Sequence, residues 1–374
     1  MDTKFKIMFN NSFFNKTVLI TGHTGFKGSW LTTWLLKLGA SVVGISKDIP
    51  TTPSMFEELK LGNKITDIRA DIRDLSKINE IVNYYKPDFI FHLAAQAIVS
   101  SSYFDPLETM TTNVIGTMNI LEVLRNYNQK CTTIIITSDK CYDNVESVWG
   151  YKEVDALGGK DIYSGSKGAA ELVIKSYYHS YFKENHPVRI GIGRAGNVIG
   201  GGDWAKDRIV VDCMKAWYNK QSVNIRSPKA TRPWQHVLEP LSGYLSFASE
   251  LENNIKLNGE SFNFGPHAEK SHTVLELIDQ LASNWGHKNI NVAYNVTDNI
   301  PFHEAGLLKL NCDKAMYYLK WESTLNYNET LKMISLWYKK HNDNKGNLYL
   351  FTVNQIKNYE KLATERSQKW ATNQ

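Results

Sequence analysis

The feature that most constrains the fold is an alternation, between Lys16 and Ile192, of short apolar runs with longer amphipathic ones. The apolar runs are predicted strands, at residues 17–21, 41–45, 89–93, 132–137 and 188–193. They are apolar almost throughout, as in strands covered on both faces, whereas strands of a sheet exposed on one side would alternate apolar and polar residues. The pattern therefore predicts an α/β fold, a doubly wound parallel sheet with helices on both faces.

The alternation weakens after Gly193, where glycine and proline become frequent and irregular loops outnumber clear elements. We therefore expect a large domain over residues 12–193, to which a later segment near 232–258 returns. A smaller, loop-rich C-terminal substrate domain is expected over residues 194–231 and 259–340. Residues 341–374 are expected to form a C-terminal helical tail.

Composition narrows the classes of function. The 43 Lys and Arg residues exceed the 38 Asp and Glu residues by only five and are dispersed, which does not indicate a nucleic-acid partner. No apolar run is long enough to span a membrane, and asparagines interrupt residues 1–16, so we expect a cytoplasmic protein with no membrane association. The four cysteines have no C-x-x-C or cysteine–histidine spacing, which predicts free thiols in a reducing compartment and no metal site.

A glycine-rich turn, Thr21-Gly22-His23-Thr24-Gly25-Phe26-Lys27-Gly28, separates the first predicted strand from a predicted helix. A tight turn needs positive φ, close approach of the backbone to a pyrophosphate leaves no room for a Cβ atom, and a helix N-terminus offers free N–H groups. The context therefore predicts a dinucleotide site of the Rossmann type, although a glycine turn that serves packing alone is the alternative. The predicted contacts are Gly22, Thr24, Gly25, Phe26 and Gly28.

The end of the second strand does not decide between NAD and NADP. A ribose-binding carboxylate is expected about twenty residues after the turn, where the chain has Ser46, Lys47 and Asp48. Asp48 is a poor match, and Lys47 could meet a 2′-phosphate instead. Further along, Asp71 and Ile72 could flank the adenine, although Asp71 could equally cap a loop.

Tyr163 and Lys167 stand four residues apart on a helix predicted to follow the strand that ends near Thr137. This spacing places the phenol and the ammonium on one helical face. A neighbouring ammonium and a nicotinamide cation would both lower the pKa of the phenol by stabilising the phenolate. Tyr163 could then accept a proton as hydride leaves a sugar carbinol. The alternative is an ordinary pair on a helix surface.

Taken together, these motifs resemble the extended branch of the short-chain dehydrogenase/reductase superfamily, which modifies nucleotide sugars. The resemblance rests on the three glycines, on Ala94-Ala95-Gln96, on Asn113 and on the Tyr163/Lys167 pair, in this order and spacing. It implies a fold with a Rossmann-type domain and an NAD cofactor contacted by Ala94, Ala95, Gln96, Asn113, Tyr163 and Lys167. Asn113 and Gln96 could instead be ordinary polar residues of a helix and a loop.

Longer blocks resemble one family within that branch, the CDP-glucose 4,6-dehydratases. The blocks are residues 137–142, 149–151, 194–204, 230–237 and 303–306, and the resemblance spans about residues 16–321. It implies that NAD⁺ oxidises C4 of CDP-glucose, that water is lost across C5 and C6, and that the hydride returns to C6, giving a precursor of surface polysaccharide sugars. The alternatives are a dehydratase or epimerase acting on a dTDP-, GDP- or UDP-linked sugar, or a non-catalytic protein that senses dinucleotides.

An elimination of this kind needs a base for the C5 hydrogen and an acid for the C6 oxygen. By the same resemblance, Asp139 is the acid and Ser138 bonds the C4 oxygen. Related dTDP-glucose dehydratases carry a glutamate base where this chain has Lys140, so Lys140 would have to act with a depressed pKa or through a water. The alternative for Asp139 and Lys140 is a solvated pair in a turn.

A pyrophosphate-linked cytidine needs cations, a surface for its ring and hydrogen bonds to its edge. The resemblance assigns Arg232 and Asn197 to the phosphates. It also implies a homodimer, formed through paired helices of the large domain, or a higher homo-oligomer. Each of the weaker candidates could be an ordinary loop residue, and Trp234 and His236 could simply pack the domain junction. These weaker candidates are Arg208, Arg226, Trp234, Gln235, His236, His303 and Glu304.

Overall fold

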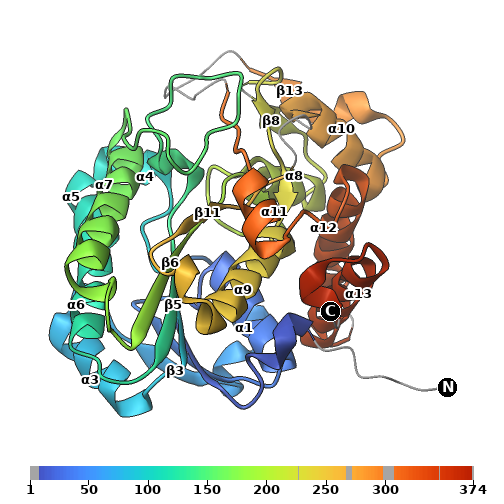
Figure 1. Ribbon diagram of the computed structural model, residues 1–374. Helices are drawn as coiled ribbons and strands as arrows, with labels where there is room; N and C mark the ends of the chain where they lie inside the picture. Colours follow the sequence, from blue (N-terminus) through green and yellow to red (C-terminus); the bar gives the residue numbers. More distant parts are fainter. Residues whose placement is uncertain (1–7, 226, 267–271, 298–306, 345, 373–374) are drawn as a thin grey trace.

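The computed structural model describes residues 8–225, 227–266, 272–297, 307–344 and 346–372. At its centre lies a seven-stranded sheet with the order β11-β6-β5-β4-β1-β2-β3, in which every pair of neighbours is parallel (Figure 1). The strands are β1 (Thr17–Thr21), β2 (Ser41–Ser46), β3 (Thr66–Arg69), β4 (Phe89–His92), β5 (Cys131–Ile136), β6 (Val188–Arg194) and β11 (Ser261–Asn263).

Helices cover both faces of the sheet. On one face lie α3 (Leu75–Tyr85), α6 (Gly116–Arg125) and α7 (Ile162–Tyr177), and on the other lie α1 (Phe26–Lys37) and α9 (Leu238–Asn253) (Figure 1). Alternate side chains of β1 pack against the two helical layers. Val18 and Ile20 belong to one apolar cluster, and Leu19 belongs to the other. This two-sided burial confirms the expected doubly wound α/β fold.

All five expected strands are present, and the sheet has two more, β3 and β11. The sequence of β3 is Thr66-Asp67-Ile68-Arg69, which is polar and largely exposed at the sheet edge, so it lacks the apolar run by which the other strands were found. Strand β11 has only three residues. It pairs with β6, so the chain takes part in the central sheet as far as Asn263.

Apart from α9, short paired strands and two helices make up much of the chain between β6 and α11. The strands are β7 (Val198–Ile199) with β10 (Gln235–His236), β8 (Val223–Ile225) with β13 (Tyr294–Val296), and β9 (Thr231–Arg232) with β12 (His272–Thr273). The main helices are α8 (Ile209–Tyr218) and α10 (Val274–Trp285), and α11 (Asp313–Leu319) follows. The division of the chain into two domains near residue 193 stays a prediction.

The C-terminal segment packs on the body of the protein through α12 (Tyr327–Asn342) and α13 (Leu348–Glu365). Glu360 on α13 accepts a hydrogen bond from Trp34 Nε1 at 2.9 Å and pairs with Lys37 at 2.6 Å, both on α1. The Tyr359 hydroxyl donates to Glu239 on α9 at 2.8 Å. These contacts fix α13 against the helical layer that includes α1 and α9.

Three short helices lie in the first third of the chain: α2 (Met55–Glu58), α4 (Val99–Phe104) and α5 (Pro106–Met110). A π-helical turn, Thr111–Ile115, leads from α5 into α6. Among the residues with described positions, no helix combines the length and the apolar character that crossing a membrane requires.

Candidate active site

A cleft of about 1230 Å³ opens where the strands of the sheet end. Its lining includes the residues that directly follow β1, β3, β4, β5 and β6, together with the last residue of β2. The order of the strands reverses between β1 and β4, and in doubly wound sheets ligands bind at such a switch point, beyond the carboxyl ends of the strands. The cleft is therefore where the fold predicts a dinucleotide.

Two of the three glycines in the first turn are required by close packing. Gly22 has a φ of +77°, and a Cβ atom there would lie 2.8 Å from the backbone nitrogen of Ala94. A Cβ atom on Gly28 would overlap the carbonyl oxygen of Gly22. Gly25 meets no such constraint and faces the cleft with Thr24 and Phe26. This cradle at the start of α1 has the shape and the free N–H groups that a pyrophosphate needs.

Asn113 connects two walls of the cleft without lining it. Its amide donates to the carbonyl oxygen of Gln96 (3.1 Å) and to Ser166 Oγ (2.9 Å), and its oxygen accepts from the Gln96 N–H (2.8 Å). Gln96, Ala94 and Ala95 line the cleft after β4, and Asp71 and Ile72 line it after β3. Asn113 lies in the π-helical turn, a geometry that is frequent at functional sites.

The five predicted catalytic residues all line the cleft. Ser138, Asp139 and Lys140 follow β5, while Tyr163 and Lys167 lie on one face of α7, with the Lys167 ammonium 5.9 Å from the centre of the Tyr163 ring. The hydroxyl of Ser138 lies 2.9 Å from Asp139 Oδ1, and Ser138 also hydrogen bonds Tyr163. The structure therefore brings these side chains together as the sequence predicts.

Burial sets the protonation of the Tyr163/Lys167 pair. It raises the pKa of Tyr163 to about 12, although the positive charge of Arg208 and the hydrogen bond with Ser138 act in the opposite direction. Burial also lowers the pKa of Lys167 to about 8, although the charge of Glu171 acts to raise it. A phenol with such a pKa is a weak base at neutral pH, so a bound cation is needed to stabilise the phenolate.

The nine substrate candidates divide into three groups. Asn197, Arg208, Arg232 and Trp234 line the cleft. Three others, Arg226, His303 and Glu304, lie outside the described residues.

Gln235 and His236 are buried and do not line the cleft. The Gln235 amide donates to the carbonyl oxygens of Gly196 and Phe264, both at 3.0 Å. The ring of His236 packs edge-on against Trp30, its Nδ1 accepts from the Leu238 N–H, and burial lowers its pKa to about 3. Both side chains pack the interior, so a direct contact with substrate is not supported for either.

Two functional features were not found from the sequence. Lys27, inside the glycine motif, lines the cleft, and burial lowers its pKa to about 8, with the charge of Arg208 adding to the effect and that of Asp139 opposing it. Behind the catalytic segment, Glu171 on α7 pairs with Arg194 at the end of β6. Glu171 follows Lys167 by four residues, and that spacing was the available signal.

The sheet, the glycine cradle and the Ser138/Tyr163/Lys167 arrangement define the class, an extended short-chain dehydrogenase/reductase. A family model described as GDP-mannose 4,6 dehydratase matches residues 19–334. The chain is 45% identical to a CDP-glucose 4,6-dehydratase of Salmonella typhimurium over 87% of this chain and 90% of that protein. It is 25% identical to a dTDP-glucose 4,6-dehydratase of Haemophilus influenzae over 86% and 97% of the two chains.

Solved structures agree on the fold. A UDP-glucose 4-epimerase of Thermotoga maritima superposes with a TM-score of 0.75 at 22% identity, over 87% of this chain and 99% of that one. A dTDP-glucose 4,6-dehydratase of Streptomyces venezuelae with NAD bound superposes with a TM-score of 0.75 at 19% identity, over 89% of this chain and 99% of that one. The chain therefore belongs to the GDP-mannose 4,6-dehydratase family, in the branch of the CDP-glucose 4,6-dehydratases, which confirms the resemblance seen in the sequence.

Proposed function

We propose that the protein is an NAD-dependent hydro-lyase that converts CDP-D-glucose into CDP-4-keto-6-deoxy-D-glucose. The observation that carries the proposal is that one cleft holds both the dinucleotide cradle and Ser138, Asp139, Lys140 and Tyr163. An epimerase needs no acid and base for an elimination, so the Asp139-Lys140 pair favours dehydration. The 45% identity to the Salmonella enzyme supports CDP-glucose as the substrate.

The residues of the cradle fit a dinucleotide, because Gly22 and Gly28 let the turn close tightly against α1 and Gly25 lines the cleft without a side chain. When bound, NAD⁺ supplies a hydride acceptor at C4 and returns the hydride at C6. Gly22, Thr24, Gly25, Phe26 and Gly28 would hold its pyrophosphate at the N-terminus of α1. The adenine would lie near Asp71 and Ile72, and Lys167 would reach the nicotinamide half.

In the first step, Tyr163 would accept the proton of the C4 hydroxyl. Ser138 hydrogen bonds Tyr163 and lies 2.9 Å from Asp139, so its hydroxyl is placed to bond the C4 oxygen and to orient it. The positive charge of the bound nicotinamide would lower the pKa of the Tyr163 phenol from its high value in the free protein.

In the second step, the 4-keto group acidifies the C5 hydrogen, which makes the loss of a poor leaving group at C6 feasible. Asp139 would donate a proton to the C6 oxygen as the C6–O bond breaks, and Lys140 would accept the proton from C5. Both side chains follow β5 and line the cleft beside Tyr163. The role of Lys140 rests on its position in the segment where related dehydratases carry a glutamate.

On the substrate side, Arg232 and Asn197 would bind the pyrophosphate, and Arg208 and Trp234 are candidates for the remaining contacts. The roles of Arg226, His303 and Glu304 stay predictions. The product would be a precursor of deoxysugars for surface polysaccharides. The enzyme itself would be cytoplasmic.

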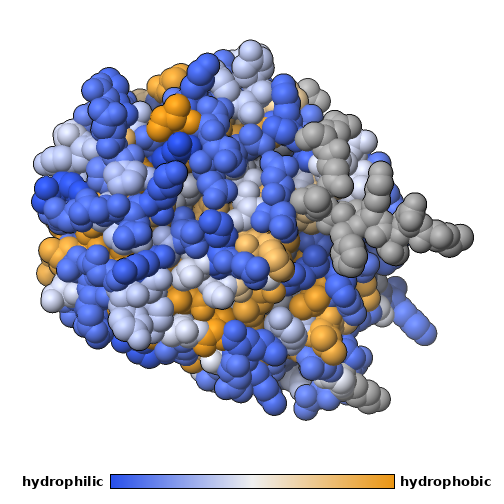
Figure 2. Space-filling view, turned by 60° about the horizontal axis from the view of Figure 1, so that its bottom comes forward, coloured by the Kyte–Doolittle hydropathy of each residue, from blue (hydrophilic) through white to orange (hydrophobic). Residues whose placement is uncertain are grey.

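We also propose a homodimer formed through α4, α5 and α7. These helices expose apolar side chains, among them Phe104 (79% exposed), Leu107 (72%) and Leu172 (54%). Figure 2 shows hydrophobic surface at its left edge, the side on which α5 and α7 lie in Figure 1. Exposed apolar area of this kind favours burial against a second copy related by a twofold axis. Light scattering at low and high protein concentration would measure the mass.

A substrate panel tests the proposed reaction. The purified protein would be incubated with NAD⁺ and CDP-, dTDP-, GDP- or UDP-glucose, and mass spectrometry would record the loss of water. Loss of water from CDP-glucose alone is expected, and Tyr163→Phe should abolish it without abolishing binding of the dinucleotide. Dehydration of a different nucleotide sugar would contradict the cytidine assignment, and the absence of product with all four would contradict the proposed reaction.

A further inference from the structure

The adenosine end of the cleft lacks the acidic residue that usually receives the ribose 2′-hydroxyl at the end of the second strand. Here β2 ends at Ser46, and Lys47 follows it, both lining the cleft. A lysine at this place is suited to a 2′-phosphate, which would favour NADP. The surroundings of Lys47 and Ser46 therefore decide which dinucleotide fits.

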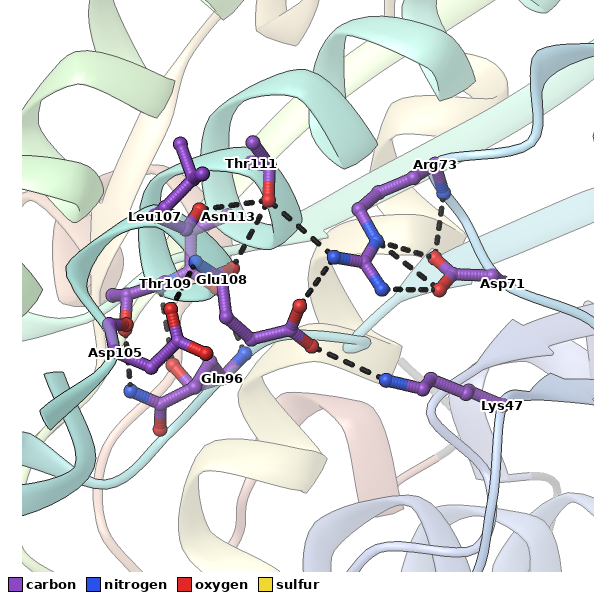
Figure 3. A network of polar contacts seen from close by, with 10 residues as sticks. All are labelled: Lys47, Asp71, Arg73, Gln96, Asp105, Leu107, Glu108, Thr109, Thr111 and Asn113. Atoms are coloured by element: carbon purple, nitrogen blue, oxygen red, sulfur yellow. Dashed lines mark hydrogen bonds and ion pairs between the residues drawn. The ribbon is translucent and has the colours of Figure 1, made fainter.

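Lys47 forms an ion pair with the Glu108 carboxylate, which belongs to a larger network of polar contacts (Figure 3). Its ammonium pairs with Glu108 Oε1 at 3.3 Å, and Arg73 Nη1 bonds the other oxygen of Glu108. The guanidinium of Arg73 also binds the Asp71 carboxylate. Nη2 donates to Oδ2 at 2.6 Å, and Nε lies 3.0 Å from Oδ1 and 3.1 Å from Oδ2. The hydrogen bonds from Arg73 hold the pKa of Asp71 below its usual range, so that carboxylate stays ionised.

The net charge of this end of the cleft is unfavourable for a phosphate. Three cations, Lys47, Arg69 and Arg73, stand beside four carboxylates, Asp48, Asp67, Asp71 and Glu108. Arg69 is itself paired with Asp67 at 2.8 Å. To bind Lys47, a 2′-phosphate would have to break the ion pair between Lys47 and Glu108. The phosphate would then lie close to the unpaired Glu108 carboxylate, and repulsion between the two negative charges opposes this.

Ser46 supplies the acceptor that the second strand otherwise lacks. Its hydroxyl lies 2.9 Å from His23 Nδ1, and His23 Nε2 lies 2.8 Å from Asp67 Oδ1. Burial lowers the pKa of His23, so the ring is neutral, and the carboxylate can only accept, which assigns the proton to Nε2. Nδ1 is then an acceptor, so Ser46 donates to it. The Ser46 oxygen accepts a long hydrogen bond from the Thr24 N–H (3.4 Å) and keeps its other lone pair for a further donor.

From these two arrangements we propose that the adenosine end of the cleft selects a dinucleotide with a free ribose 2′-hydroxyl, and that Glu108 sets this preference by holding Lys47 and Arg73. The Ser46 oxygen would accept a hydrogen bond from that hydroxyl, in place of the missing carboxylate. The inference rests on the proposed function, because it assumes that the cleft binds NAD.

Direct binding tests the inference. Purified protein, freed of copurified nucleotide, would be titrated calorimetrically with NAD⁺ and with NADP⁺ at low ionic strength. In Glu108→Gln, Lys47 loses its carboxylate partner and Arg73 keeps only Asp71. The preference for NAD⁺, written as Kd(NADP⁺)/Kd(NAD⁺), should therefore fall by about tenfold or more, since hydrogen bonds between charged groups are the stronger ones. The control is Glu80→Gln, which removes a carboxylate paired with Lys77 on the exposed surface of α3.

The other variants separate the contributions. Adding Lys47→Met to Glu108→Gln should restore the preference for NAD⁺, and a gain in NADP⁺ affinity that persisted would overturn the role of Lys47. Ser46→Ala should weaken NAD⁺ without strengthening NADP⁺, whereas unchanged NAD⁺ affinity would overturn the role of Ser46.

The outcomes distinguish the inference from the proposed function. An unchanged preference in Glu108→Gln, in a protein whose wild type binds NAD⁺, would overturn the inference and leave the proposed function intact. A wild type that bound neither nucleotide would contradict the proposed function itself.

Discussion

Arg194 and Glu171 form a bidentate ion pair in the interior, with Nε–Oε1 and Nη2–Oε2 distances of 2.8 Å and side chains no more than 3% exposed. Thr137, the residue before Ser138, donates to the same carboxylate at 2.5 Å. Arg194 also donates to the Tyr142 hydroxyl at 2.8 Å. The pair therefore connects the end of β5, the helix of Tyr163 and Lys167, and the end of β6.

Removing one partner of this pair should destabilise the protein strongly. Arg194→Met leaves the Glu171 carboxylate buried without compensation, and such a change lowers the free energy of unfolding by about 3–5 kcal/mol. Urea denaturation followed by circular dichroism would measure it. The control is Arg125→Met, which breaks a pair with Glu122 at the surface of α6 and should leave the free energy of unfolding nearly unchanged. Equal effects of the two variants would contradict a structural role for the buried pair.

Gly196 determines where the proposed acid can lie. A Cβ atom on Gly196 would overlap the carboxylate of Asp139, so Gly196→Ala should displace that side chain and reduce kcat by about a hundredfold or more if Asp139 is the general acid. Gly165→Ala is the matched control, since a Cβ atom there meets open space and alanine favours the helix. Full turnover in Gly196→Ala would remove Asp139 from the mechanism.

Lys140 is the proposed base for the C5 hydrogen, so its removal should stop the reaction after oxidation at C4. We expect Lys140→Ala to release CDP-4-ketoglucose that has not lost water, and to exchange little deuterium from heavy water into C5. Mass spectrometry distinguishes this sugar from the dehydrated product. The same substitution at Lys130, an exposed residue just before β5, should change neither quantity. Normal dehydration by Lys140→Ala would assign the base to another group.

The buried ring of His236 should make stability fall in mild acid. Burial lowers its pKa from 6.5 to about 3, so the unfolded chain binds a proton that the folded protein does not. The stability from this group is complete above pH 6.5, and it is lost as pH falls toward 3, at up to about 1.4 kcal/mol per pH unit.

Urea denaturation between pH 7 and pH 5 would compare wild type with His236→Asn. Other titrating groups are common to both proteins, so the difference between the two curves isolates His236. The variant should show the shallower decline, and parallel curves would contradict the protonation assigned to this ring.

The sequence predicted the elements that carry a local signature. The apolar runs revealed the five inner strands. The glycines revealed the turn, because a Cβ atom on Gly22 would collide with Ala94 and a Cβ atom on Gly28 would collide with Gly22. The Tyr163/Lys167 pair lies within one turn of a helix. Each of these features depends on neighbours in the chain, so spacing alone could show it.

Other features depend on contacts between distant segments. The pairing of Glu171 with Arg194 spans 23 residues, and the pairing of Lys47 with Glu108 spans 61. His236 belongs to a two-residue strand whose two side chains are both buried, so no alternation indicated that its ring faces the core. The polar sequence of β3 hid a strand whose place is fixed by pairing with β2.

The most direct test of the proposed reaction is the fate of the hydrogen at C4 of the sugar. CDP-glucose carrying deuterium at C4 would be converted by the protein in ordinary water, and the product would be examined by mass spectrometry and nuclear magnetic resonance. An internal redox cycle predicts a 4-keto-6-deoxy product with the deuterium on C6. Deuterium retained at C4, or lost from the product, would contradict it.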